Sequence, residues 1–90
     1  MRTSNLEPLE RVTTFHDSAH AENRRIERGI SMQAMKDVIN YPDRRKQQYP
    51  GEHGGMVYRC CKRDGTKELV VIAEIKKSEA WLISGFYNSI

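Results

Sequence analysis

Two kinds of hydrophobic spacing divide this chain into a helical part and a β-rich part. The stretch Ala19–Arg28 lacks Pro and Gly and follows Asp17 and Ser18, whose side-chain oxygens can accept a hydrogen bond from the first turn of a helix. Gly29 suits the left-handed residue that commonly ends a helix. These signals predict a first helix over residues 19–28.

A second helix is expected directly afterwards, over Met32–Asn40. Ser31 can cap its N-terminus, and the residue before Pro42 resists helical geometry, so the helix should end there. Apolar side chains recur within it at the helical interval, which predicts a buried stripe on one side. The stripe is formed by Met35, Val38 and Ile39.

The remainder of the chain has the pattern of strands and turns. Strands are expected over Arg45–Tyr49, Met56–Lys62, Glu68–Ile75 and Ala80–Tyr87. The pair Asp64-Gly65 favours a hairpin turn, and the apolar run at 69–73 predicts a central strand covered on both faces. In a regular strand Trp81 and Phe86 would lie on opposite faces, because odd intervals alternate sides.

Together these elements predict an α+β fold, with two short N-terminal helices packed on a three- to four-stranded antiparallel sheet. Residues 1–14 are expected to form an arm, with a short extended piece over residues 11–15 as an option, and residues 15–90 the folded domain. With both helices on one side, the opposite face of the sheet would stay partly open. Such a face is a natural place for an extended chain or a nucleic acid to bind.

Length and composition agree with one small folded domain: the chain has 90 residues, of which 38% are hydrophobic and 30% charged. No apolar run is long enough to span a bilayer, and no secretory signal follows Met1, so we expect a cytoplasmic protein without membrane contact. Cys60 and Cys61 are adjacent and should point to opposite faces of a strand, both reduced. The thin core and exposed sheet edge are compatible with a homodimer.

Positive charge is concentrated in one segment, although the net charge of the chain is only +3. Seven Lys and Arg residues lie in the segment from Arg44 to Lys67, which contains only two Asp and Glu residues. A basic segment favours a phosphate-bearing partner, whereas the alternative interpretation is an edge strand whose charges oppose aggregation. The candidate RNA-binding residues are Arg44, Arg45, Tyr58, Arg59 and Lys62.

The first predicted helix carries a stripe that could perform chemistry. At about 100° per residue, His20, Arg24 and Arg28 fall on one side, while Ala19 and Ile26 fall on the other and should face the core. An imidazole can transfer protons near neutral pH, and guanidinium groups bind phosphate and stabilise charge that develops on it. The set suits attack by an RNA 2′-hydroxyl on the adjacent phosphate. The alternative is a solvated helix face with weak Arg–Glu pairs.

The same residues carry a resemblance to a known family. The run His20…Arg24…Arg28-Gly-Ile-Ser31, followed by the segment 38–43, resembles a small bacterial domain family of unknown function. That family is similar to BrnT and RelE toxins of the barnase–EndoU–colicin–RelE ribonuclease superfamily, and the resemblance covers about residues 15–87. Tyr41 separates the Asn and Pro that are adjacent in its pattern. The resemblance implies a RelE-like fold and a metal-independent, toxin-like endoribonuclease.

In this interpretation His20 is the base, Arg24 and Arg28 hold the phosphate, and a cognate antitoxin or immunity protein neutralises the toxin. The alternative function is a non-catalytic RNA- or protein-binding module of the same fold. No cofactor or metal is expected: His16 and His20 have a metal-ligand spacing, but the cap at residues 17–18 leaves His16 outside the helix. Trp81 and Phe86 can stack on bases, but aromatic rings in so small a domain more often belong to the core.

Overall fold

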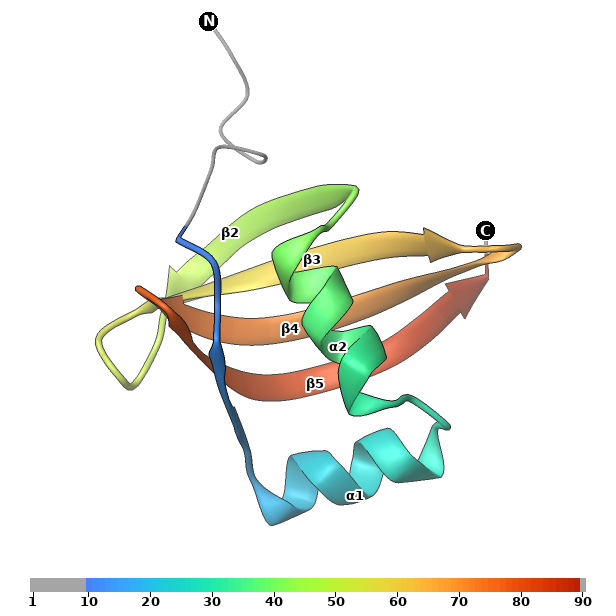
Figure 1. The fold of residues 1–90 in the computed structure, drawn as a ribbon, viewed down its shortest axis with the longest axis horizontal. Helices are drawn as coiled ribbons and strands as arrows, with labels where there is room; N and C mark the ends of the chain where they lie inside the picture. The colour runs from blue at the N-terminus through green and yellow to red at the C-terminus, as the bar shows by residue number, and fades with distance from the viewer. Residues whose placement is uncertain (1–9, 90) are drawn as a thin grey trace, which may run out of the picture.

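The computed structural model describes residues 10–89, which form two helices and a single sheet (Figure 1). In chain order the elements are β1 (Thr14–Asp17), α1 (Ala19–Glu27), α2 (Met32–Asn40), β2 (Arg44–Pro50), β3 (Met56–Asp64), β4 (Lys67–Lys76) and β5 (Glu79–Ser89). The strand order across the sheet is β1-β5-β4-β3-β2. Strand β1 runs parallel to β5, and all other neighbours are antiparallel.

The fold class predicted from sequence is wrong in its sheet. The sheet is five-stranded and mixed, rather than three- to four-stranded and antiparallel, and a strand precedes the two helices. Strand β1 escapes the sequence pattern because it has only four residues, Thr-Phe-His-Asp. Its pairing is also remote in sequence, since Thr14 lies opposite Glu79. The α+β content and the two helices are confirmed.

Both helices begin and end where their local signals predict. The Oγ atom of Ser18 accepts a hydrogen bond from the backbone N–H of Ala21 at 3.1 Å, and that of Ser31 does so from Ala34 at 3.0 Å. Gly29 follows α1 with a φ of +69°, a conformation that glycine adopts without strain. The tight corner between α1 and α2 therefore depends on short-range sequence signals.

The hydrophobic core lies between α2 and one face of the sheet (Figure 1). Its residues are Val12, Ile30, Met35, Val38, Ile39, Cys60, Leu69, Val71, Ala73, Ile75, Ala80 and Leu82. Cys60 is fully buried here, and the loss of hydration raises the pKa of its thiol to about 12. Residues 1–9 of the predicted arm lie outside the described residues. Neither described helix is long and apolar enough to cross a membrane.

Helix α1 packs along β5, but the side of the helix that faces the protein is not the side with Ala19 and Ile26 that the sequence predicts. Ile26, expected in the core, has 60% of its surface exposed, whereas Ala21 is buried. The side facing the rest of the protein carries Arg25, whose side chain is only 12% exposed. The prediction was wrong because it assigned the apolar residues to the interior, while this helix is held mainly by polar contacts.

Candidate nucleic-acid interface

The sheet has a second face, opposite α2, which we call the outer face. Residues paired across neighbouring strands point to the same side of a sheet, so the register defines rows of outer-face side chains. Three neighbouring rows are Tyr49, Val57, Glu74, Trp81 and His16; then Lys46, Arg59, Ile72 and Ser84; then Arg44, Cys61, Val70 and Phe86. They are flanked by a row of Arg63, Glu68 and Asn88 and by a row of Thr14, Glu79 and Lys76. Aromatic and basic residues therefore share a surface that α2 does not cover.

A β-bulge in β5 brings two aromatic rings onto this face. Ile83 is an extra residue, because the register with β4 shifts between Ile72 and Ala73. The shift places Trp81 and Phe86 on the same side of the sheet, and the sequence prediction of opposite faces is therefore wrong. Bulges commonly re-aim side chains at functional sites.

A second bulge, in β2, has the same effect on a tyrosine. The register with β3 shifts between Gln47 and Tyr49, so that Gln48 is the extra residue. Tyr49 thereby joins Lys46 on the outer face, although their odd separation would place them on opposite sides of a regular strand. Tyr49 is 55% exposed. Both bulges thus add aromatic surface to one face.

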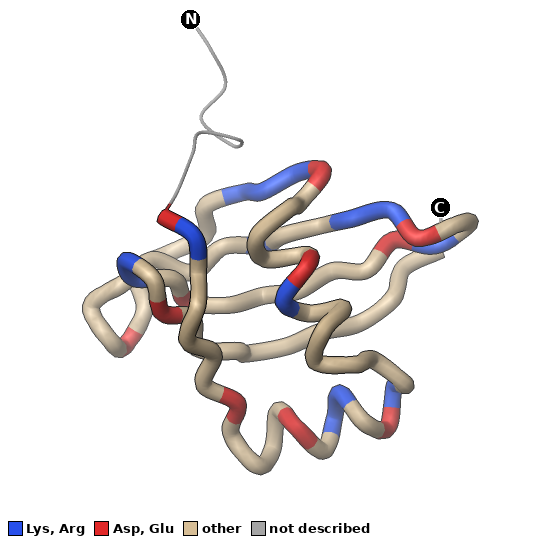
Figure 2. The backbone as a smooth tube through the Cα atoms, viewed as in Figure 1, with Lys and Arg blue, Asp and Glu red and all other residues tan. Residues whose placement is uncertain are grey.

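The positive charges beside the aromatic rings of the outer face come from β2 and β3. Figure 2 shows the basic residues of β2 grouped along the edge strand, and of these Arg44 and Lys46 point to the outer face. The exposed side chain of Arg44 pairs with Glu68, and the guanidinium of Arg59 lies 5.8 Å from the ring centroid of Phe86. Lys46 is exposed beside them. Cations next to aromatic rings are the combination that nucleic-acid backbones and bases require.

A groove of about 810 Å³ adjoins this charged area around Trp81. The indole ring stacks on two imidazoles: the centroid of His16 lies 4.9 Å away and that of His53 lies 4.4 Å away, with interplanar angles of 16° and 7°. His16 approaches from β1 on one side of β5, and His53 from the β2–β3 loop on the β4 side. The three rings form a short stack open to the groove.

The loop that carries His53 is held over the sheet by a buried carboxylate. Glu74, 3% exposed, accepts hydrogen bonds at its Oε2 atom from the backbone N–H of His53 at 2.8 Å and of Gly55 at 2.7 Å. A Cβ atom at Gly51 would lie 2.1 Å from the Glu74 Cδ atom, so only glycine fits there. The position of His53 therefore depends on Glu74.

A sequence profile described as Domain of unknown function (DUF4258) matches residues 18–84 of this chain. The chain belongs to the DUF4258 family. No curated protein and no solved structure shows significant similarity to it. The DUF4258 match includes His53 and Trp81 but begins at Ser18, so it leaves out the whole of β1, including His16.

The DUF4258 domain places two of the five candidate RNA-binding residues on the outer face, Arg44 and Arg59. The other three lie on the side of α2. Arg45 is buried with its guanidinium 5.7 Å from the ring centroid of Tyr58, and Tyr58 packs against the core. The Nζ atom of Lys62 donates to the backbone carbonyl of Tyr41 at 2.9 Å. Alternation along β2 and β3 separates the predicted set into two groups.

Two residues of the predicted catalytic stripe, His20 and Arg24, lie in α1, and Arg28 caps its C-terminus, but none of the three lines the groove. His20 and Arg24 are exposed on α1. The Nη1 atom of Arg28 donates a 2.7 Å hydrogen bond to the carbonyl of Gly85, and this bond joins the end of α1 to β5. The catalytic assignment of these three residues remains a prediction, and Arg28 also has a structural role in the DUF4258 domain.

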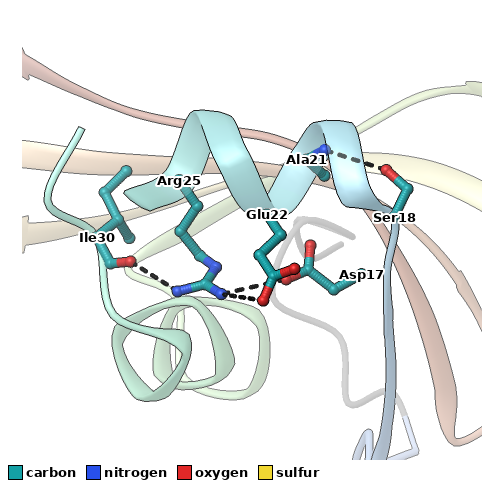
Figure 3. Close-up of polar contacts among 6 residues, drawn as sticks. All are labelled: Asp17, Ser18, Ala21, Glu22, Arg25 and Ile30. Atoms are coloured by element: carbon teal, nitrogen blue, oxygen red, sulfur yellow. Dashed lines mark hydrogen bonds and ion pairs between the residues drawn. The ribbon is translucent and has the colours of Figure 1, made fainter. Parts of the chain in front are cut away.

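Arg25, which the sequence analysis did not single out, holds α1 in place (Figure 3). Its Nη1 atom donates to the carbonyl of Ile30 at 3.1 Å, and its Nη2 atom lies 3.3 Å from the carboxylate of Asp17 and 4.0 Å from that of Glu22. The Asp17 side chain is 13% exposed and lines the groove. This ion pair therefore connects the helix to the wall of the candidate site.

From sequence, Trp81 was expected in the core or as a stacking residue, and His16 was weighed only for its metal-ligand spacing with His20. His53 falls between the strands predicted at 45–49 and 56–62, and no sequence signal indicated where its side chain would lie. Among residues 10–89 no group of three or more His, Cys, Asp or Glu side chains is arranged to hold a metal ion. Two of the chain's three histidines, His16 and His53, are instead arranged around the ring of Trp81.

Proposed function

We propose that this DUF4258 domain binds single-stranded RNA on its outer face. The observation that carries the proposal is the coincidence, on one face, of the basic side chains of β2 and β3 with the rings of Tyr49, Trp81 and Phe86. Cations can neutralise phosphates, and every nucleobase has a face that can stack on an aromatic ring. The arrangement suits binding that tolerates many sequences.

A single strand fits this surface better than a duplex. Stacking on protein rings requires unpaired bases, whereas the bases of a duplex are stacked on one another. The resemblance to RelE-type ribonucleases favours RNA over DNA. A DNA oligonucleotide of the same sequence is therefore the natural comparison in each binding measurement.

Replacing three basic side chains of the outer face by neutral ones should weaken RNA binding about tenfold at low salt. In the variant Arg44→Gln/Lys46→Gln/Arg59→Gln three phosphate contacts are lost. For a single strand this also flattens the logarithmic salt dependence by about 2, at roughly 0.7 per contact. Fluorescence anisotropy of a labelled RNA oligonucleotide at several salt concentrations measures both effects.

The matched control removes the same charge from the other side of the sheet. Lys36→Gln/Lys62→Gln/Lys67→Gln leaves the outer face intact, because Lys36 lies on α2, Lys62 contacts Tyr41, and Lys67 lies 5.7 Å from the ring of Tyr87. We expect this variant to retain most of the affinity. Equal losses in the two triple variants would contradict binding at the outer face.

A second candidate function is the toxin-like, metal-independent endoribonuclease, neutralised by an antitoxin or immunity protein. The observation favouring it is that α1 places His20 and Arg24 one turn apart and exposed. Within residues 10–89 neither side chain makes a hydrogen bond or an ion pair, so both are available to a substrate.

Expression of an active nuclease should slow bacterial growth, and His20→Ala or Arg24→Ala should restore it. Asn23→Ala, on the same exposed helix, is the control and should stay toxic if the wild type is. Purified protein should cleave RNA in the presence of EDTA. Harmless expression together with intact RNA under these conditions would exclude the nuclease.

A further inference from the structure

We propose that Trp81 is the stacking platform for one RNA base, and that His53 occupies the place of that base in the free protein. The inference rests on the proposed RNA binding and specifies one part of it. It differs from the charge-based argument because it concerns a groove that contains no lysine or arginine among its lining residues.

The geometry of the stack is that of an aromatic ligand in its site. The imidazole of His53 lies 4.4 Å from the indole centroid and within 7° of parallel. Offset-stacked rings in this range attract one another, and nucleobases stack on tryptophan in the same way. A base could therefore take the position of the imidazole without any change in the orientation of Trp81.

His53 is the ring that can leave, and His16 is the one that stays. His16 belongs to β1, where its backbone is paired with β5, and its Nε2 atom lies 3.7 Å from the carboxylate of Glu79. The side chain of His53 makes no hydrogen bond or ion pair within residues 10–89; its backbone N–H is the group that Glu74 holds. Rotation about the His53 side-chain bonds can thus vacate the indole while the loop remains in place.

The charge of the groove selects a base rather than a phosphate. Its ionisable lining groups other than histidine and tyrosine are the carboxylates of Asp17, Glu52 and Glu74. These repel phosphate but tolerate a neutral ring. The volume of about 810 Å³ lies within the range of about 300–1,000 Å³ that small-molecule sites occupy.

The phosphates of the same strand can reach the neighbouring row. Arg59 lies two residues along β3 from Val57, which is in the row of Trp81, so the rows are about 7 Å apart. An RNA strand can therefore place its backbone on Arg59 and Lys46 while one base enters the groove. A free nucleotide has the same ring but would bring its phosphate close to the carboxylates, so we infer a base within an RNA strand.

Trp81 is the only tryptophan of the chain, so its fluorescence reports on this site alone. We expect an eight-nucleotide oligoadenylate RNA to quench the emission of the full chain saturably, with the same Kd that anisotropy gives. Adenosine monophosphate at equal concentration should leave the emission unchanged. His53→Ala should bind the RNA about two- to tenfold more tightly, because no ring has to be displaced.

Trp81→Leu should weaken RNA binding about tenfold in anisotropy. Tyr87→Leu, which removes an aromatic ring on the side of α2, is its control. His53→Ala probes the same ring stack at an exposed side chain, so its effect on RNA affinity can be measured without disturbing the core.

RNA binding with unchanged Trp81 emission and unaltered affinity in His53→Ala would overturn this inference and leave the proposed function standing. Quenching by adenosine monophosphate alone would overturn it too, and failure of all RNA binding in anisotropy would overturn both.

Discussion

Arg25→Ala is expected to lower the free energy of unfolding by about 3 kcal/mol, because it leaves a buried carboxylate without its partner. The side chains of Arg25 and Asp17 are 12% and 13% exposed, so water cannot replace the lost contact fully. The carbonyl of Ile30 loses its donor as well. Helix α1 buries Ala21 alone among its residues, so little apolar contact compensates. Urea denaturation followed by circular dichroism measures the change.

Arg24→Ala is the control for this substitution. It removes the same side chain one residue earlier, where it is exposed, and should change stability by no more than about 0.5 kcal/mol. Asp17→Asn in the background of Arg25→Ala should recover part of the loss, because the unpaired charge is gone. If Arg25→Ala and Arg24→Ala cost the same, the ion pair does not hold α1.

Glu74→Ala should release the loop that carries His53, at a cost of about 2 kcal/mol. The backbone N–H groups of His53 and Gly55 both donate to this buried carboxylate, and hydrogen bonds to charged groups are the stronger kind. Hydrogen exchange at these two amides is expected to accelerate by roughly 30-fold, which corresponds to that free energy. Nuclear magnetic resonance of the native protein gives the rates.

Two further variants define the role of Glu74. Glu74→Gln keeps an acceptor of the same size and should show a smaller acceleration than Glu74→Ala. Glu79→Ala removes a half-exposed carboxylate near the same ring stack and should leave both amides protected. Unchanged exchange in Glu74→Ala would show that other contacts close the loop.

The helices of this protein are encoded locally, and for that reason they could be predicted. Ser18, Ser31 and Gly29 act within a few residues of the helix ends that they define. For β1 the local pattern indicated only a short extended piece over residues 11–15 and not a strand of the sheet. Its four residues become a strand because β5 offers a free edge, a fact that only the completed sheet supplies.

The outer face shows a second limit of sequence patterns. Alternation correctly separates Cys60 from Cys61, since the stretch of β3 around them pairs regularly. It fails for Trp81 and Phe86, because one unpaired residue in β5 reverses the alternation between them. Of the predicted RNA-binding arginines, Arg44 and Arg59 lie on the outer face, whereas strand alternation turns Arg45 inward, where it is buried.

The pairing of β1 with β5 also determines when the groove around Trp81 can form. His16 lies opposite Trp81, near the two ends of the described chain. During translation β1 emerges early and has no partner until β5 has left the ribosome tunnel, and contacts so remote in sequence form slowly. The hairpins of β2 to β4 can assemble beforehand. The nascent protein therefore presents its basic strands before its aromatic groove, and the proposed recognition of a base requires β5 to have paired with β1.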